Sequence, residues 1–231
     1  MSLLQCNHLY KNYGNKEILK DIDITIEKGK IIGLLGKNGT GKTTLIKLIN
    51  DLLTPTKGEI LIHGEPIGVE SKKVVAYLPE RTYLDKTMTV EKAIKFFGEF
   101  YEDFDMEKAY RLISDLGLDV KQKLSKMSKG MQEKVQLVLV ISRRADLYLL
   151  DEPLGGVDPA TRDYILDTIL SNFNEGASVI MSTHLISDIE RILDEVIIIN
   201  DGEVVLSGNC DDLRQQEGGS IDDLFRRMFK C

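Results

Sequence analysis

Residues 31–44, IIGLLGKNGTGKTT, are the most informative segment for the fold of this chain. Its second half contains the pattern G-x-x-x-x-G-K-[ST], and its first half is an unbroken apolar run of the kind that forms a buried strand. In this pattern the glycines let the loop wrap so that backbone N–H groups point inward at phosphate oxygens, and a helix begins directly after the loop. The stretch therefore predicts a strand, a phosphate-binding loop and a helix, in that order.

Single residues of this loop have predicted roles in binding a nucleotide. Lys42 is expected to reach the β- and γ-phosphates, and the hydroxyl of Thr43 is expected to ligate Mg²⁺. The positive end of the following helix adds to the attraction for phosphate. The complete set of predicted nucleotide-binding residues in the loop is Gly36, Lys37, Asn38, Gly39, Thr40, Gly41, Lys42, Thr43 and Thr44.

Further apolar runs of the same kind occur at residues 74–78, 147–150, 178–181 and 196–199. Unbroken rather than alternating runs are typical of strands that are covered on both faces, as in parallel sheets. Helical segments fall between the runs, and one of them begins where Asp158 can cap a helix and a proline fits its first turn. This alternation predicts an α/β fold with a parallel sheet flanked by helices, and the phosphate-binding loop identifies its core as resembling that of a P-loop NTPase.

The segments around this core have other patterns. Residues 89–141 are predicted as a helical insertion, because apolar side chains recur at three- and four-residue spacing. The stretch GEILIHGEPI alternates and is rich in turns, which predicts an antiparallel β layer near the amino terminus. We therefore expect a single domain over residues 1–231. Within it we expect the core and β layer at about 1–88 and 142–210, the helical subdomain at about 89–141 and a short tail at 211–231.

Composition and charge exclude several classes of function. The net charge of −7 argues against broad nucleic-acid binding through the phosphate backbone. Cys6, Cys210 and Cys231 are odd in number and widely spaced, so they fit neither a disulfide framework nor a zinc site, and reduced thiols indicate a cytosolic compartment. No secretory signal and no apolar run long enough to span a bilayer are visible, so work at a membrane would need spans on another polypeptide.

Two acidic residues follow the apolar run in LYLLDEP, residues 147–153. Ligands of parallel sheets bind at the carboxyl ends of the strands, so Asp151 is expected to hold the metal through its bound water. Glu152 should point differently, because successive strand residues alternate, and it is expected to accept a proton from the attacking water.

The histidines receive different interpretations. In VIMSTHL, residues 179–185, His184 follows another apolar run whose strand could lie beside the other two. There it could hydrogen-bond the γ-phosphate and orient water. His8 and His63 lack such a setting and are interpreted as structural histidines.

In their order along the chain, these motifs resemble those of an ATP-binding-cassette (ABC) ATPase, the nucleotide-binding subunit that powers membrane transporters. The resemblance covers essentially the whole chain. It implies ATP and Mg²⁺ as cofactors, with Lys42, Glu152 and His184 as catalytic residues. It further implies a sandwich dimer of two ATPase protomers, identical or related, and a transmembrane permease subunit on a separate chain at the cytoplasmic face of the membrane.

The segment KMSKGMQEKVQL, residues 126–137, has a role in this resemblance. It places a serine, a lysine and a glycine just ahead of a helix-like run, where backbone N–H groups can meet an anion. It occupies the place of the family signature, usually Leu-Ser-Gly-Gly-Gln; Ser128 and Gly130 match that signature, whereas Lys129 and Met131 depart from it. In the family this segment contacts the γ-phosphate of ATP held by the other protomer, so one chain should not close a complete catalytic site alone.

The resemblance implies roles for three further residues. Tyr13, in KNYGNKEIL, matches the aromatic residue that stacks on adenine. Glu80, in AYLPE, stands where the family usually has glutamine, a residue that bridges the metal, the attacking water and the helical insertion; a carboxylate can still ligate Mg²⁺. Asp158 matches the aspartate of the loop usually written Ser-Ala-Leu-Asp.

These features predict the ATP-binding and ATP-hydrolysing subunit of an ABC transporter. The YLPE form and the signature variant resemble a bacterial export branch, which favours export. The alternative is a soluble ABC-type ATPase in cofactor assembly, or a regulatory switch with little turnover. The sequence leaves the cargo, the direction of transport and the choice between homodimer and heterodimer open.

Overall fold

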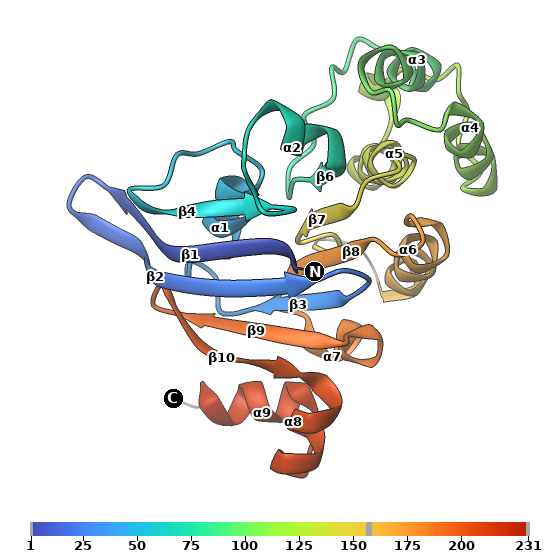
Figure 1. The fold of residues 1–231 in the computed structure, drawn as a ribbon. Helices are drawn as coiled ribbons and strands as arrows, with labels where there is room; N and C mark the ends of the chain where they lie inside the picture. Colours follow the sequence, from blue (N-terminus) through green and yellow to red (C-terminus); the bar gives the residue numbers. More distant parts are fainter. Residues whose placement is uncertain (1, 156–158, 230–231) are drawn as a thin grey trace.

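The computed structural model describes residues 2–155 and 159–229, which form two sheets covered by helices (Figure 1). Within these residues the larger sheet has the strand order β10-β9-β3-β8-β7-β6. Neighbouring strands from β9 to β6 run parallel, and β10 pairs antiparallel with β9. The bounds are β3 (Ile31–Leu35), β6 (Val75–Leu78), β7 (Leu147–Asp151), β8 (Ser178–Thr183), β9 (Glu195–Asn200) and β10 (Glu203–Asn209). This arrangement confirms the predicted α/β fold class.

Both faces of the larger sheet are covered, as the unbroken apolar runs predict. In β7, Leu147 and Leu149 belong to one buried cluster, whereas Tyr148 and Leu150 belong to another. Because successive side chains of a strand point to opposite faces, the two clusters are the two apolar layers of the core. The strand β6 begins one residue later than predicted, because Val74 ends the short helix α2 (Val69–Val74).

The smaller sheet is antiparallel and has the order β2-β1-β4-β5. Its strands are β1 (Ser2–Tyr13), β2 (Lys16–Glu27), β4 (Lys57–Ile62) and β5 (Glu65–Pro66). In β2 the buried residues alternate with exposed ones near the carboxyl end, at Ile22, Ile24 and Ile26. One face of this sheet therefore packs on the core, as expected for an antiparallel layer.

Helices between β6 and β7 form the predicted helical insertion, with α3 and α4 at the top of the view (Figure 1). These helices are α3 (Val90–Phe100), α4 (Met106–Asp115), η1 (Leu124–Lys126) and α5 (Lys129–Ile141). Side-chain oxygens of Thr89, Asp105 and Ser128 accept hydrogen bonds from backbone N–H groups in the first turns of α3, α4 and α5. These caps fix where each helix begins.

Some of the remaining helices lie between strands of the larger sheet in the sequence, and the last two follow β10. They are α1 (Lys42–Ile49), α6 (Pro159–Asn172), α7 (Ile186–Ile189), η2 (Glu190–Ile192), α8 (Cys210–Glu217) and α9 (Ile221–Met228). Ile221 and Leu224 of α9 are buried, so this helix packs on the protein. Cys6 and Cys210 are buried free thiols, and Cys231 lies outside the described residues. No helix in the described ranges has the length and apolar character needed to span a bilayer.

Candidate functional site

Three of the predicted site stretches meet at one edge of the larger sheet. The strands β3, β8 and β7 are parallel neighbours, with Leu35 opposite Thr183 and Asp151 opposite Ser182. The phosphate loop follows β3, Glu152 follows β7 and His184 follows β8. The sheet register thus brings together residues that are far apart in the sequence, as expected at the carboxyl ends of parallel strands.

Glycines in the loop are required by close contacts with other segments. A Cβ atom on Gly36 would lie 2.5 Å from the carbonyl oxygen of Ile199, at the end of β9. Gly41 has φ +110°, and a Cβ atom there would lie 2.6 Å from Leu19. Only glycine fits these positions without displacing neighbours.

Lys42 is the first residue of α1, and its side chain is only 6% exposed. Its Nζ donates hydrogen bonds to the carbonyl oxygens of Gly36 at 2.7 Å and Lys37 at 3.2 Å. Burial lowers the pKa of Lys42, while the charges of Glu152 and Asp151 act in the opposite direction. The ammonium group is therefore held over the phosphate loop with two carboxylates nearby.

Asp151 is almost completely buried at the end of β7. Its Oδ1 accepts hydrogen bonds from the hydroxyls of Ser182 at 2.6 Å and Thr43 at 3.1 Å, whereas its buried Oδ2 has no hydrogen-bond partner. A buried carboxylate oxygen without a partner is costly. Together with the adjacent Thr43 hydroxyl, it forms an oxygen donor set of the kind that Mg²⁺ prefers, so these residues fit the metal that the sequence predicts.

Ser182 is a residue of this site that the sequence analysis does not identify. Besides bonding to Asp151, its hydroxyl accepts a hydrogen bond from the backbone N–H of Glu152 at 3.1 Å. It therefore holds both acidic residues. The available signal is its position two residues before His184, at the end of an apolar run, but a serine there has no distinctive spacing.

Glu152 lies just beyond the end of β7 and has φ +51°, in the left-handed region. Its carboxylate lies 3.0 Å from Nδ1 of His184 and 3.9 Å from Nζ of Lys42. The alternation of side chains along a strand would only point the side chain of Glu152 to the opposite face of the sheet from that of Asp151. The left-handed backbone, which costs energy outside glycine, turns the chain where the carboxylate meets Lys42 and His184.

These residues surround a cavity of about 730 Å³, hereafter the main cavity. Its walls are formed by the phosphate loop, Glu80, Glu152 and His184, and also by Ile18, Arg81 and Lys129. The sequence assigns no role to Ile18 or Arg81, and neither belongs to a recognised pattern. The volume is within the usual range for small-molecule sites.

Some predicted binding residues lie away from the main cavity. Tyr13 is half-exposed at the end of the β1–β2 hairpin, with Nζ of Lys11 5.2 Å from its ring centroid. Ser128 caps α5 and Gly130 lies in its first turn, and neither lines the cavity, although Lys129 between them does. Asp158 lies outside the described residues.

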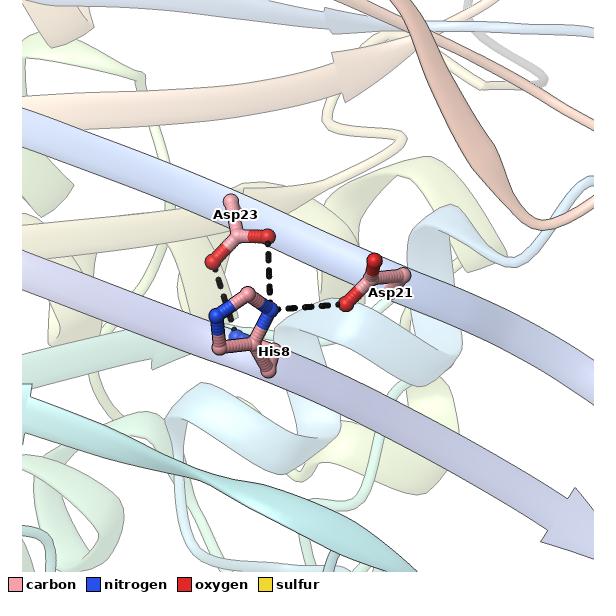
Figure 2. A group of neighbouring side chains, drawn as sticks. All are labelled: His8, Asp21 and Asp23. Carbon is pink, nitrogen blue, oxygen red and sulfur yellow. Dashed lines mark hydrogen bonds and ion pairs between the residues drawn. The ribbon is translucent and has the colours of Figure 1, made fainter.

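The other two histidines pair with carboxylates outside the main cavity. Figure 2 shows His8 between Asp21 and Asp23 on the antiparallel sheet, where its Nδ1 lies 2.9 Å from Asp21 and 3.3 Å from Asp23. The hydrogen bond with Asp21, followed by the charges of Asp23 and Asp21, raises the pKa of His8. His63 Nε2 lies 2.7 Å from Asp146. The contacts of both residues are consistent with the structural interpretation.

A family model described as ABC transporter matches residues 19–155, which include the phosphate loop, α5 and the acidic pair. Among curated proteins, the ABC-type transporter ATP-binding protein EcsA of Bacillus subtilis (strain 168) is 33% identical over 100% of this chain and 98% of its own. The SkfA peptide export ATP-binding protein SkfE, from the same strain, is 33% identical over 89% of this chain and 88% of its own. The Linearmycin resistance ATP-binding protein LnrL, also from that strain, is 32% identical over 94% and 72%.

Solved structures agree with the sequence comparisons. A structure described as the ATP-binding subunit of an ABC transporter superposes with a TM-score of 0.88 at 30% identity, and covers 99% of this chain and 100% of its own. A putative ABC transporter ATP-binding protein from Pyrococcus furiosus has a TM-score of 0.69 at 34% identity, over 78% of this chain and 90% of its own.

Proposed function

The chain belongs to the family of ABC transporter ATP-binding proteins, and from this we propose that it hydrolyses ATP to drive transport through a membrane-spanning subunit on a separate chain. The observation that carries the proposal is the meeting of Lys42, Glu152 and His184 at one wall of the main cavity. The carboxylate of Glu152 lies 3.0 Å from His184 and 3.9 Å from Lys42. A base, a cation and a second hydrogen-bonding group are thereby available around one bound phosphate.

Catalysis in this proposal consists mainly of positioning and charge neutralisation. Lys42 and the loop N–H groups hold the terminal phosphates, and Glu152 accepts the proton of the attacking water. His184, through the imidazole nitrogen that does not bond Glu152, contacts the γ-phosphate. Thr43, Asp151 and Glu80 would hold Mg²⁺, which neutralises charge on the phosphate oxygens.

The second half of the site comes from another protomer. Ser128 and Gly130 do not line the main cavity of their own chain, and Lys129 between them is 80% exposed. The first turn of α5 is therefore accessible to a phosphate held elsewhere, which supports a contact with the nucleotide of a second ATPase chain. We assign Asp158 to the same interface by the resemblance, and the exposed ring of Tyr13 to adenine.

The proposed permease contact is a groove that shares Arg81 with the main cavity. This groove of about 540 Å³ is lined by Arg81 and by the exposed apolar side chains of Leu52, Tyr83 and Phe100. Lys47 and Lys72 also line it, so an occupying segment of the permease should carry apolar and acidic side chains. Phe100 is the last residue of α3, so the helical insertion, residues 89–141, would move together with the permease.

The proposed direction of transport is export. It is supported by the name of one relative, the SkfA peptide export ATP-binding protein SkfE, and by the resemblance of YLPE and the signature variant to an export branch. The protein would then work on the cytoplasmic face of the membrane. The alternative, a soluble ABC-type ATPase in cofactor assembly or a regulatory switch, shares the site chemistry and lacks the permease.

Isolation of the native complex tests this proposal. Tagged protein is recovered from detergent-solubilised native membranes, and its partners are identified by mass spectrometry. A stoichiometric multi-span protein is the expected partner. Recovery only from the cytosol with soluble partners would contradict the transport function and leave the ATPase chemistry to the alternative.

A further inference from the structure

The side chain of Gln136, on α5, is only 2% exposed and contacts the loop that follows β6. Its Nε2 donates a hydrogen bond to the carbonyl oxygen of Pro79 at 3.3 Å. Its Oε1 accepts a hydrogen bond from the backbone N–H of Tyr83 at 3.2 Å. One buried amide thus binds both ends of the segment that carries Glu80 and Arg81.

This loop has little other polar support, although Leu84 packs against one of the buried apolar clusters. In the part of the chain that the structure describes, residues 79–84 make no further hydrogen bond or ion pair. Glu80 and Arg81 are both exposed and line the main cavity. Because the loop belongs to no helix or strand, the amide of Gln136 is the polar contact that holds its backbone on either side of these two residues.

The same face of α5 extends to the acidic residues of the site. Lys129, Glu133 and Gln136 are spaced by four and three residues and therefore lie on one side of the helix. Lys129 lines the main cavity, and Glu133 and Gln136 line a small cavity of about 30 Å³ together with residues that include Glu80, Asp151 and Glu152. The helix that begins at the proposed cross-protomer phosphate contact thus also borders the proposed metal ligands.

We propose that Gln136 is a positioning residue, which fixes the loop bearing Glu80 and Arg81 to α5 so that a movement of α5 moves both side chains in the main cavity. This inference rests on the proposed function, in which Glu80 contributes to the Mg²⁺ site. Gln136 would then couple the two phosphate-binding regions of one chain, which are the main cavity and the first turn of α5. A glutamine with a purely structural role would stabilise the fold without affecting how Glu80 serves the metal.

Replacement of the amide by an apolar chain of similar length tests the contact directly. In Gln136→Met, the backbone N–H of Tyr83 loses its acceptor, so its hydrogen exchange should become about ten-fold faster or more. Gln132→Met is the matched control, because Gln132 lies one turn earlier on α5 and bonds the carbonyl oxygens of Leu124 and Met127 instead. The control should leave the exchange of the Tyr83 amide unchanged.

Calorimetric affinity for ATP, measured with and without Mg²⁺, tests the positioning role without relying on turnover. Gln136→Met should reduce the gain in ATP affinity that Mg²⁺ provides by about five-fold, the scale of one lost hydrogen bond. Glu80→Ala should reduce the gain similarly, and the double variant should lose no more than either single variant, because both changes remove the same interaction.

The outcomes separate this inference from the proposed function. Unchanged exchange at Tyr83 in Gln136→Met would overturn the contact. Faster exchange with an unchanged Mg²⁺ gain, or additive losses in the double variant, would overturn the positioning role. A wild-type protein that binds ATP but does not hydrolyse it would overturn the proposed ATPase activity, while the exchange and calorimetric results would still decide the role of Gln136.

Discussion

The carboxylate of Glu152 lies 3.0 Å from Nδ1 of His184, although the two residues follow different strands. The contact exists because β7 and β8 are parallel neighbours with Asp151 opposite Ser182. The backbone of Glu152 is held by two hydrogen bonds from its N–H to the carbonyl and hydroxyl oxygens of Ser182. The proposed base is thus fixed both at its backbone and at its carboxylate.

Loss of the carboxylate at this position should abolish most turnover. Glu152→Gln keeps the shape and the hydrogen-bonding capacity of the side chain but removes the proton acceptor. We expect ATP hydrolysis to fall by about 10²–10⁴-fold, as for the loss of a general base. Steady-state phosphate release measures this, with ATP affinity of the variant as the control for folding. A variant with at least half of the wild-type rate would contradict the assignment of Glu152 as the base.

A methyl group on Gly36 should damage the phosphate loop. Its Cβ would lie 2.5 Å from the carbonyl oxygen of Ile199 and 2.6 Å from the hydroxyl of Thr40, so the loop must move away from β9. We expect Gly36→Ala to lower the free energy of unfolding by about 1–3 kcal/mol, the scale of overpacking. ATP affinity should fall as well.

Gly68→Ala is the matched control for this prediction, because a Cβ atom at Gly68 meets nothing within 4 Å. Urea unfolding and calorimetric ATP binding of both variants provide the measurement. Equal stability and equal ATP affinity of Gly36→Ala and the wild type would show that the close contacts do not constrain the loop.

The pairing of His8 should make stability depend on pH above about 6.5. Its pKa is raised from the ordinary value of 6.5, first by the hydrogen bond with Asp21 and then by the charges of Asp23 and Asp21. A raised pKa in the folded state means that the stabilisation is fully present below the unfolded-state pKa of about 6.5, and is lost as pH rises through the folded-state pKa.

An NMR titration of the imidazole signals measures this shift. We expect the pKa of His8 to lie above 6.5 in the wild type and to move down in Asp21→Asn, where the charge is removed. A pKa at or below 6.5 in the wild-type protein would contradict the pairing. The midpoint of thermal unfolding should decline more in the wild type than in Asp21→Asn as pH rises through that range.

The parallel sheet and the phosphate loop could be predicted because their signals are local. Each buried strand is an unbroken apolar run, since both of its faces are covered, and the loop glycines recur at fixed spacing. The acidic pair was also predictable, because ligands bind at the carboxyl ends of such strands. In all of these cases the residue type and its immediate neighbours carry the information.

Ser182, Arg81 and Gln136 could not be predicted, because their contacts arise from packing between distant segments. Ser182 meets Asp151 through the register of β7 and β8, and nothing in an apolar run marks its hydroxyl. Gln136 lies within the helix that follows the signature segment, and its role depends on the loop 53 residues earlier that α5 contacts. The left-handed backbone of Glu152 is likewise invisible in a stretch that ends as a strand.

If each chain supplies only half of a catalytic site, the mass of the protein in solution should depend on Mg²⁺-ATP. In the Glu152→Gln background, light scattering should show a doubling of mass on addition of Mg²⁺-ATP, because slow hydrolysis keeps the shared nucleotides in place. Adding Ser128→Arg to this background should abolish the doubling and leave the ATP affinity of the monomer unchanged. A Glu152→Gln protein that is saturated with ATP and remains strictly monomeric would contradict the shared site, as would an equal loss of monomer affinity in the Ser128 variant.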